Sequence, residues 1–443
     1  MLIEREKYLK ILVNSMNNGL IKVITGIRRC GKSFILFYFF YDHLIESGVD
    51  EENIIAVPLD DEKYREYCDP EKLYAYIREK IRDESQKYYV LIDEAPDAIS
   101  KKEIKNPEAS PALYSVLNRL NKMQNVDIYL TGSNSRYLSS NIMSDFQGCG
   151  EEIHVAPLSF SEFYAASKKE LEQAWKEYLT YGGLPHILSE SDGNAKSAYL
   201  EKMIRDVYLK DICERYDIRN KKGLQSLLEL LATKCGESVN PQKILETFEK
   251  NGTERATMPT IANFLLYLQE AFLVKKSGCY EIKGRREIST QTKYYFSDLG
   301  IRNAFLSLRG DKEPGDNNIG DNNISGNNAS GKNAIYNEMI CRGFELDSGI
   351  IETRANVDGK KIRRQLEIDF VAKKDGQKYY IQVAGEGASL MDLSRIQSTL
   401  LKIPDSFKKI IVVNEMRPLW RTEQGITVIS ILDFVLNPDS LNL

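Results

Sequence analysis

The chain has 443 residues, in which 60 lysines and arginines balance 64 aspartates and glutamates to give a net charge of −4. This length predicts several domains, and the balanced charge gives no global indication of a nucleic-acid or membrane partner. Seven scattered cysteines without a C-x-x-C pair, with only three histidines, argue against zinc and for a reducing compartment. With a charged N-terminus and no long apolar run, the sequence predicts a cytoplasmic protein without a membrane span.

The first 157 residues alternate apolar runs with segments of helical periodicity. Strands are predicted at 20–25, 53–59, 87–94 and 126–134, and helices at 5–16, 34–40, 69–85 and 111–122. Such alternation predicts a mostly parallel, three-layer α/β domain over residues 1–157. In such sheets the functional residues lie at the carboxyl ends of the strands.

Residues 26–33 match the phosphate-loop pattern G-x-x-x-x-G-K-[ST] between a predicted strand and a predicted helix. The two glycines let backbone N–H groups face a polyphosphate, Lys32 adds positive charge at the β- and γ-phosphates, and Ser33 can hold Mg²⁺. Arg28 and Arg29 either contact phosphate or pair with the acids at 60–62. The loop residues predicted to bind nucleotide are Gly26, Ile27, Arg28, Arg29, Cys30, Gly31, Lys32 and Ser33.

Hydrolysis of a bound nucleotide also needs acids beside the phosphate loop. The strand at 87–94 ends in Asp93, expected to organise Mg²⁺ with Ser33, and Glu94, the candidate base that orients water. With Lys32 these two acids are the predicted catalytic residues, and solvated acids at a strand end are the alternative. Ser133 and Asn134 end the next strand and are predicted to sense the γ-phosphate, or else form a polar strand end without that role. No Asn-Lys-x-Asp motif is present, which favours ATP over GTP.

The middle of the chain is mostly helical. We expect a helical lid at 158–220 and a winged-helix domain at 221–309, because two helices at 241–249 and 258–271 precede a basic turn and a strand. Two interpretations of this region remain open: it binds DNA, or its basic turn is a solvated hairpin without that role. The helix at 258–271 has no Lys or Arg, which argues against base reading by arginine. The basic residues considered for phosphate contact are Lys275, Lys276, Lys283, Arg285, Arg286 and Lys293.

Residues 310–332 are rich in Asn, Gly and Asp, and we expect a disordered insert there. A second α/β unit follows at 333–443, with a helix at 334–342, a polar hairpin at 350–365 and strands at 366–371 and 378–383. Glu338, Asp369 and Gln382 follow the order of acids in the PD-(D/E)xK nuclease fold. Ala384 stands where the lysine of that motif is expected, so we expect a vestigial site on a restriction-endonuclease-like scaffold rather than a working nuclease.

Several of these segments together resemble a predicted bacterial and archaeal ATPase family of the AAA superfamily: 23–33, 91–94, 130–135, 156–163 and 178–185. The segments at 293–300 and 334–338 are similar to the uncharacterised domain that is fused behind such ATPases. The resemblance implies a P-loop NTPase fold with ATP, ADP and Mg²⁺ as ligands. This chain departs from the family's pattern at Cys149, because the family tends to have an arginine in the corresponding stretch. An arginine finger can contribute roughly 10³-fold or more to the rate of hydrolysis.

These features predict an ATP-binding, slowly hydrolysing switch. One alternative is a DNA-binding nuclease or defence effector regulated by ATP. Another is an ATP-dependent protein-interaction scaffold without catalysis. The expected partners are ATP and ADP. DNA at the winged-helix region, an unidentified protein and self-association are left open. No membrane partner is expected.

Overall fold

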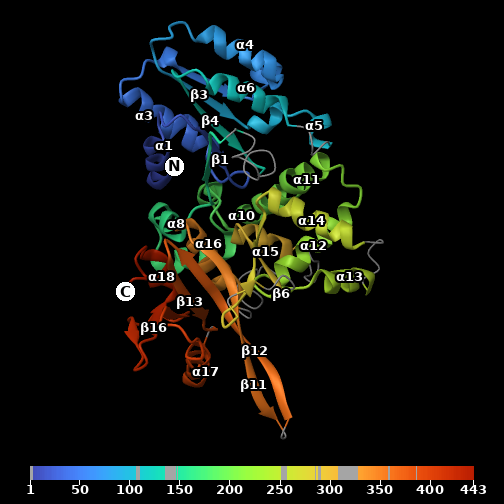
Figure 1. Ribbon diagram of the computed structural model, residues 1–443, viewed down its shortest axis with the longest axis vertical. Helices are drawn as coiled ribbons and strands as arrows, with labels where there is room; N and C mark the ends of the chain where they lie inside the picture. Colours follow the sequence, from blue (N-terminus) through green and yellow to red (C-terminus); the bar gives the residue numbers. More distant parts are fainter. Residues whose placement is uncertain are drawn as a thin grey trace. The chain divides into compact units, whose positions relative to one another are not determined.

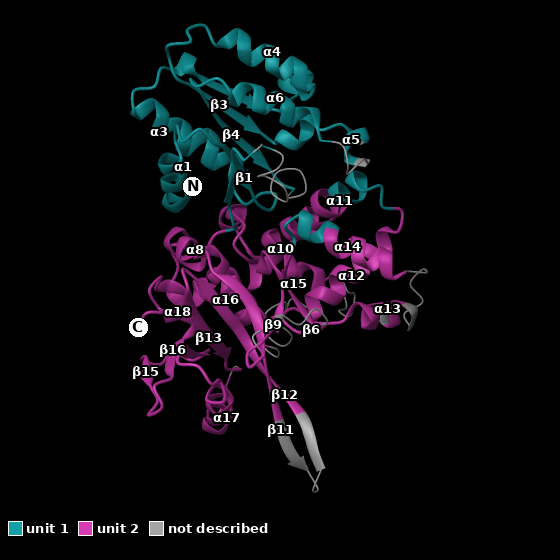
Figure 2. Cartoon of the chain, viewed as in Figure 1, with its two compact units in different colours: residues 1–157, 210–218, 267–273 teal, residues 158–209, 219–266, 274–443 magenta. Residues whose placement is uncertain are grey.

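The computed structural model describes residues 3–105, 110–134, 146, 148–250, 257–284, 286–287, 291–307, 328–357, 360–385 and 387–443 (Figure 1). The chain forms two compact units (Figure 2). Unit 1 contains residues 1–157, 210–218 and 267–273, and unit 2 contains residues 158–209, 219–266 and 274–443. Two segments from the regions expected to be lid and winged helix therefore belong to unit 1. The expected insert lies outside the described residues from 310 to 327.

Unit 1 is built on a parallel sheet with the strand order β2-β3-β4-β1-β5, which confirms the predicted α/β class. Each predicted strand of the sheet is present within a few residues of its expected bounds. The elements of unit 1 are α1 (Glu6–Asn14), β1 (Ile21–Thr25), α2 (Lys32–Phe34), η1 (Ile35–Phe40), α3 (Tyr41–Glu46), η2 (Glu51–Asn53), β2 (Ile54–Pro58), η3 (Glu62–Cys68), α4 (Pro70–Lys80), β3 (Tyr88–Asp93), η4 (Ala95–Ala98), α5 (Lys101–Lys105), α6 (Ala112–Asn121), β4 (Val126–Gly132), β5 (Gly150–His154), α11 (Lys210–Arg215) and the last turn of α14 (Met258–Glu270).

Helices cover both faces of this sheet (Figure 1). On one face, alternate residues of β1 to β4 form an apolar core with α4 and α6. On the other face, Phe40 of η1 packs against Tyr129 of β4, with ring centroids 4.5 Å apart. Lys22 and Asp127 form a fully buried ion pair on this second face. Strands covered on both sides explain why their sequences are nearly continuous apolar runs.

Strand β5 was not predicted from the sequence. It contains two glutamates in five residues, so its composition does not indicate a strand. It pairs in parallel with β1, from Ile21 opposite Gly150 to Thr25 opposite His154. This pairing places Val155, the residue after β5, beside the phosphate loop.

Unit 2 contains a three-stranded sheet, β6-β10-β7, and an eight-stranded sheet, β15-β16-β14-β13-β12-β11-β8-β9. Its elements are α8 (Phe160–Ser167), α9 (Leu171–Tyr181), η5 (Pro185–Ser189), α10 (Gly193–Lys202), η6 (Met203–Leu209), α12 (Lys221–Thr233), β6 (Ser238–Val239), α13 (Pro241–Lys250), β7 (Val274–Ser277), β8 (Cys279–Glu281), β9 (Arg286–Glu287), β10 (Thr292–Phe296), α15 (Leu299–Ser307), α16 (Ala329–Cys341), β11 (Glu345–Val357), β12 (Lys360–Lys374), β13 (Gln377–Val383), α17 (Leu390–Leu400), β14 (Lys408–Val413), β15 (Trp420–Arg421), β16 (Thr427–Ser430) and α18 (Ile431–Leu436).

The C-terminal elements differ from the expected ones in three ways. Helix α16 begins at Ala329, five residues before the expected start at 334 and inside the expected insert. The hairpin expected at 350–365 and the strand expected at 366–371 are one long antiparallel pair, β11 and β12 (Figure 1). Strand β8, from the expected winged-helix region, pairs in parallel with β11 and so belongs to the C-terminal sheet.

Two motifs of unit 2 are explained by the carboxylate of Asp298. It is 2% exposed and accepts hydrogen bonds from the backbone N–H groups of Gly183, at 2.7 Å, and Ile301, at 3.0 Å. A Cβ atom at Gly182 would lie 2.3 Å from Asp298 Oδ1, so only glycine fits there. Burial raises the pKa of Asp298 to about 6. The Gly182-Gly183 pair after α9 and the Ser297-Asp298 pair before α15 therefore hold these two helices together.

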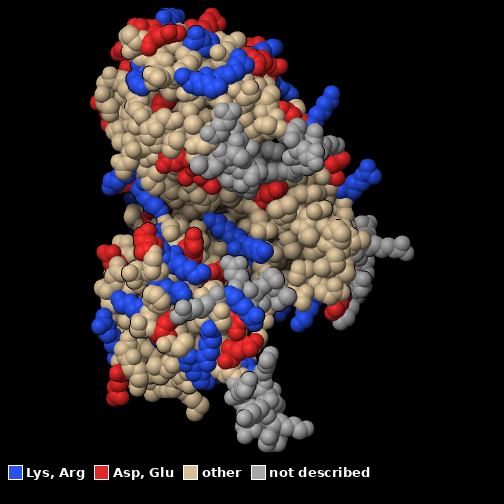
Figure 3. Space-filling model, viewed as in Figure 1, with Lys and Arg blue, Asp and Glu red and all other residues tan. Residues whose placement is uncertain are grey.

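On the face shown in Figure 3, basic and acidic residues are interspersed over both units. This pattern agrees with the balanced composition of the chain. Among the described residues, no helix is both long and apolar enough to span a membrane.

Candidate nucleotide-binding site

The phosphate loop joins β1 to α2 and turns through left-handed backbone conformations. Gly26 and Gly31 have φ angles of 145° and 103°, and Arg29 has a φ of 67°. A Cβ atom at Gly26 would lie 2.1 Å from the carbonyl oxygen of Val155. The thiol of Cys30 donates to the same oxygen at 3.3 Å. The end of β5 therefore fixes the loop and accounts for the first glycine of the motif.

Lys32 is buried, and its ammonium group donates to the carbonyl oxygens of Gly26 and Ile27 at 3.0 and 3.1 Å. These bonds hold the positive charge inside the loop. A charge placed there faces the same space as the loop N–H groups, which is where a polyphosphate binds.

Asp93 meets the phosphate loop through Ser33, as the sequence predicts. The Ser33 hydroxyl donates to Asp93 Oδ1 at 3.0 Å, and the Thr131 hydroxyl donates to the same atom. Asp93 is 5% exposed, and burial raises the pKa of this carboxyl although the two hydroxyl hydrogen bonds lower it. The arrangement leaves the second carboxylate oxygen for another ligand.

Glu94 and Ser133 are brought together because β4 lies between β1 and β3 in the sheet. The Ser133 hydroxyl donates to Glu94 Oε2 at 3.1 Å. Glu94 has a left-handed φ of 45°, and its N–H donates to the Thr131 hydroxyl at 2.9 Å. A non-glycine residue in this region is strained, and such strain is typical of functional sites. The structure thus places Lys32, Ser33, Asp93, Glu94 and Ser133 at one edge of the sheet.

The residues present fit a magnesium–nucleotide ligand. Ser33 and Asp93 offer a hydroxyl and a carboxylate oxygen, which are hard donors of the kind Mg²⁺ prefers. These two residues would hold the ion, which when bound would neutralise charge on the phosphates. Lys32 and the loop N–H groups would bind the phosphates themselves.

Asn134 lies in a chain of polar contacts that the sequence did not indicate. Its side-chain amide donates to the Tyr216 hydroxyl at 3.0 Å, and that hydroxyl donates to Glu270 Oε2 at 2.5 Å. The rings of Tyr216 and Tyr267 are stacked, with centroids 3.8 Å apart. All four residues belong to unit 1, and two of them, Tyr267 and Glu270, lie on α14.

Two further residues at the site, an acid and an arginine on α11, are not indicated by the sequence. Arg28 of the phosphate loop pairs with Asp211 at 3.0 Å, an acid outside the cluster considered at 60–62. Arg215 pairs with the same carboxylate at 3.1 Å. Arg28 Nε also donates to the Ser133 hydroxyl at 3.2 Å. No local pattern marks Asp211 and Arg215, since they lie far along the chain from the loop.

Cys149 lies at the opposite end of the sheet from the phosphate loop. It precedes β5 and its carbonyl oxygen accepts a hydrogen bond from Ile21, the first residue of β1, whereas the loop follows the last residue of β1. Five residues of strand span about 16 Å. An arginine at 149 would therefore begin about one strand length away from this chain's own phosphate loop.

The residues of the candidate nuclease site are only partly brought together. Asp369 is 2% exposed and accepts from Lys332 Nζ at 2.5 Å and from the N–H of Val383 at 2.9 Å. The side-chain oxygen of Gln382 accepts from the N–H of Asp369 at 3.2 Å. A lysine of α16 therefore compensates the charge of Asp369.

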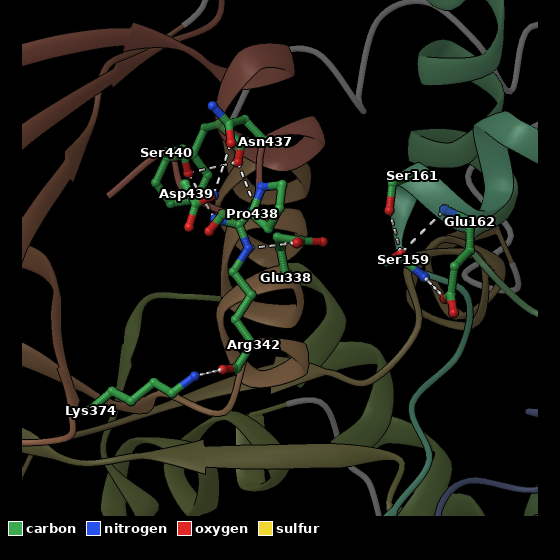
Figure 4. Close-up of polar contacts among 11 residues, drawn as sticks. Ser159, Ser161, Glu162, Glu338, Arg342, Lys374, Asn437, Pro438, Asp439 and Ser440 are labelled. Carbon is green, nitrogen blue, oxygen red and sulfur yellow. Dashed lines mark hydrogen bonds and ion pairs between the residues drawn. The ribbon is translucent and has the colours of Figure 1, made fainter. Parts of the chain in front are cut away.

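Glu338 has a different cationic partner (Figure 4). Arg342 Nε donates to its carboxylate at 2.7 Å, and the same guanidinium donates to the Phe434 carbonyl and the Ser440 hydroxyl. The pair thus anchors α16 to α18 and to the C-terminal residues that follow it. In the described part of the chain, no group of three or more His, Cys, Asp or Glu residues is placed to hold a metal ion.

The basic residues of the middle region differ in their surroundings. Lys276 and Lys283 are exposed, whereas Arg286 pairs with Glu281 at 2.6 Å. Lys293 is buried and pairs with Glu367, so it is not placed to make the phosphate contact that was one of its two interpretations. Arg285 lies outside the described residues.

The chain matches an AAA domain over residues 18–164 and a domain of unknown function, DUF8612, over residues 172–312. An uncharacterised protein of Haemophilus influenzae is 30% identical over 441 residues, which are 98% of this chain and 99% of the relative. An uncharacterised protein of Methanocaldococcus jannaschii is 25% identical over 331 residues, 70% of this chain and 66% of the relative. Among solved structures, a Walker-type ATPase of Pyrococcus abyssi is 16% identical with a TM-score of 0.47, covering 69% of this chain and 96% of that chain.

Proposed function

Because the chain belongs to the family of its Haemophilus influenzae relative and carries an AAA domain, we propose that it is an ATP-dependent switch that hydrolyses ATP slowly. The observation that carries this proposal is the contact of Ser33 with Asp93, beside Glu94. A phosphate loop, a magnesium-binding pair and a candidate base meet at one sheet edge, as nucleotide hydrolysis requires.

Two contacts support slow turnover. The carboxylate of Glu94 accepts a hydrogen bond from Ser133, so it must be released or shared before it orients water. Arg28 and Arg215 are held in ion pairs with Asp211, and these pairs must break before either arginine can stabilise the transition state.

The test is a set of three variants assayed for Mg²⁺-dependent ATP binding and turnover. Lys32→Ala should weaken ATP binding about 100-fold or more, because it removes the loop's positive charge. Glu94→Gln should keep binding and reduce turnover about 100-fold or more. Lys72→Ala, an exposed lysine on α4, is the matched control and should change neither. Unchanged binding in Lys32→Ala would refute the nucleotide site, and unchanged turnover in Glu94→Gln would favour a scaffold without catalysis.

We propose DNA contact through a winged-helix region as a second function. The order α12, β6, α13, α14, β7 and β10, with β6, β10 and β7 in one antiparallel sheet, supports it. Lys276 and Lys283 are the exposed cations that would contact phosphates. Binding should then fall steeply with salt, and Lys276→Ala with Lys283→Ala should reduce the slope of log Kd against log salt by about 2. A slope that stays the same in the double variant would exclude this surface.

We do not favour a nuclease, because the acids at 338 and 369 are compensated by Arg342 and Lys332. Metal-dependent DNA cleavage that is lost in Asp369→Ala would reverse this view and support a nuclease or defence effector regulated by ATP. An unidentified protein partner and self-association are compatible with the switch and are tested by sedimentation with and without ATP.

A further inference from the structure

The strongest unexplained feature of unit 1 is an acid that lies between two arginines. Asp211 Oδ1 is 3.0 Å from Arg28 Nη2 and 3.1 Å from Arg215 Nη2, and Asp211 Oδ2 is 3.3 Å from the same Arg215 nitrogen. One carboxylate oxygen thus bridges two guanidinium groups. Guanidinium groups bind phosphate oxygens with the same geometry and charge as they bind carboxylates.

This cluster is attached directly to the proposed ATP site. Arg28 belongs to the phosphate loop, and its Nε donates to the Ser133 hydroxyl, which in turn donates to Glu94. Glu94 also interacts electrostatically with Arg215. The two arginines therefore face the space beside the candidate base, where the last phosphate of a bound nucleotide lies.

Arg215 has unused hydrogen-bonding capacity. Its side chain is 10% exposed, and its buried Nε has no hydrogen-bond partner in the described structure. Leaving a buried N–H without a partner is costly, and such groups in native proteins call for an explanation. A ligand oxygen at this position would supply the missing acceptor.

We propose that Asp211 is an internal competitor of the γ-phosphate of ATP. It holds Arg28 and Arg215 in an ion-paired cluster, and the γ-phosphate takes over these two guanidinium groups when ATP binds. ADP has no phosphate at that position and leaves the cluster intact. Asp211 thereby sets how far the chain distinguishes ATP from ADP, and the release of α11 from the loop reports which nucleotide is bound. This inference rests on the proposed ATP site.

The decisive variant is Asp211→Asn, which keeps the size of the side chain and removes its charge. Binding of a non-hydrolysable ATP analogue and of ADP is measured by calorimetry with Mg²⁺. We expect affinity for the ATP analogue to rise about three- to tenfold, the range for a partly exposed ion pair, while ADP affinity changes less than about twofold. Glu214→Gln makes the same charge change at an exposed position on the same helix, and it should alter neither affinity.

A weaker affinity for the ATP analogue in Asp211→Asn would overturn the proposal, because it would mean that Asp211 orients the arginines for the nucleotide. An equal gain for ADP would also overturn it. If Asp211→Asn unfolds at a lower temperature than the wild type, Arg215→Gln gives the second test. That variant should lose affinity for the ATP analogue about three- to tenfold and keep its ADP affinity, and equal losses for both nucleotides would contradict the proposal.

Failure of the ATP site itself would look different. In that case the wild type would bind neither nucleotide, and Lys32→Ala would make no difference. If the wild type binds ATP in a Lys32-dependent way but Asp211→Asn binds no tighter, only the competitor role is wrong.

Discussion

Two sets of acids are candidate sites in this chain, one at the end of β3 and one on β12 and α16, and they differ in what holds their carboxylates. In unit 1, Asp93 and Glu94 accept hydrogen bonds from the hydroxyls of Ser33, Thr131 and Ser133. In unit 2, Asp369 and Glu338 are paired with the cations Lys332 and Arg342. A hydroxyl leaves the negative charge of a carboxylate available for a metal ion, whereas an ammonium or guanidinium group cancels it. The neighbouring side chains thus distinguish an acid that is available to a ligand from an acid that holds helices in place.

The largest expected effect is a loss of ATP affinity when the phosphate loop of unit 1 is distorted. Gly26→Ala would place a Cβ atom 2.1 Å from the Val155 carbonyl oxygen, so the loop cannot keep its conformation. We expect ATP affinity to fall about 100-fold or more, since the phosphate-binding N–H groups are displaced. Calorimetric titration with ATP and Mg²⁺ measures this loss.

Gly48→Ala is the matched control for this variant. Gly48 also has a positive φ, of 86°, but a Cβ atom there would meet nothing within 4 Å. It should therefore carry the backbone strain without the collision, and ATP affinity should stay within about twofold of wild type. Equal losses in both variants would show that the collision with Val155 is not the cause.

The second prediction tests the cluster of unit 2. Asp369→Asn removes the charge that compensates Lys332, and we expect unit 2 to lose about 2 kcal/mol of unfolding free energy. ATP affinity and turnover should not change. Both tryptophans, Trp175 and Trp420, belong to unit 2, so fluorescence during urea unfolding reports on this unit alone. If Asp369→Asn instead abolished metal-dependent DNA cleavage and left the unfolding free energy unchanged, Asp369 would serve a metal ion, as is proposed for Asp93.

The smallest expected effect concerns the pH dependence of unit 2. The pKa of Asp298 is raised to about 6 from its ordinary value of 3.8, so the native unit binds a proton before the unfolded chain does. The stability that this group contributes is therefore present in acid and lost as the pH rises through about 6. Between about pH 7 and pH 5, wild type should gain about 1 kcal/mol relative to Asp298→Asn. Tryptophan fluorescence in urea at each pH measures the difference, and a gain towards higher pH would contradict it.

The site in unit 1 was largely predictable because its residues follow from local rules. The phosphate loop is a contiguous motif, and Asp93, Glu94 and Ser133 end parallel strands, which must finish at one edge of a sheet. Asp211 and Arg215 were not predictable, since a short helix with mixed charges shows no sign of the loop it contacts. Strand β5 was not predictable either, because its two glutamates are not typical of a strand. In unit 2, the basic neighbours of Lys293 suggest a surface cation, but its place in β10 buries it against Glu367.

The division of unit 1 into three stretches of sequence has a practical consequence. The AAA-domain match ends at residue 164, yet residues 210–218 and 267–273 complete the unit. A fragment cut at Pro157 would lack Tyr216, which accepts from Asn134, and Phe272, whose ring lies 5.1 Å from that of His154. The stretch that matches the AAA domain and the stretches that form unit 1 are therefore not the same. Constraints of this kind tie the later two thirds of the chain to the first, and exchanging the AAA domain between relatives would require carrying these two segments with it.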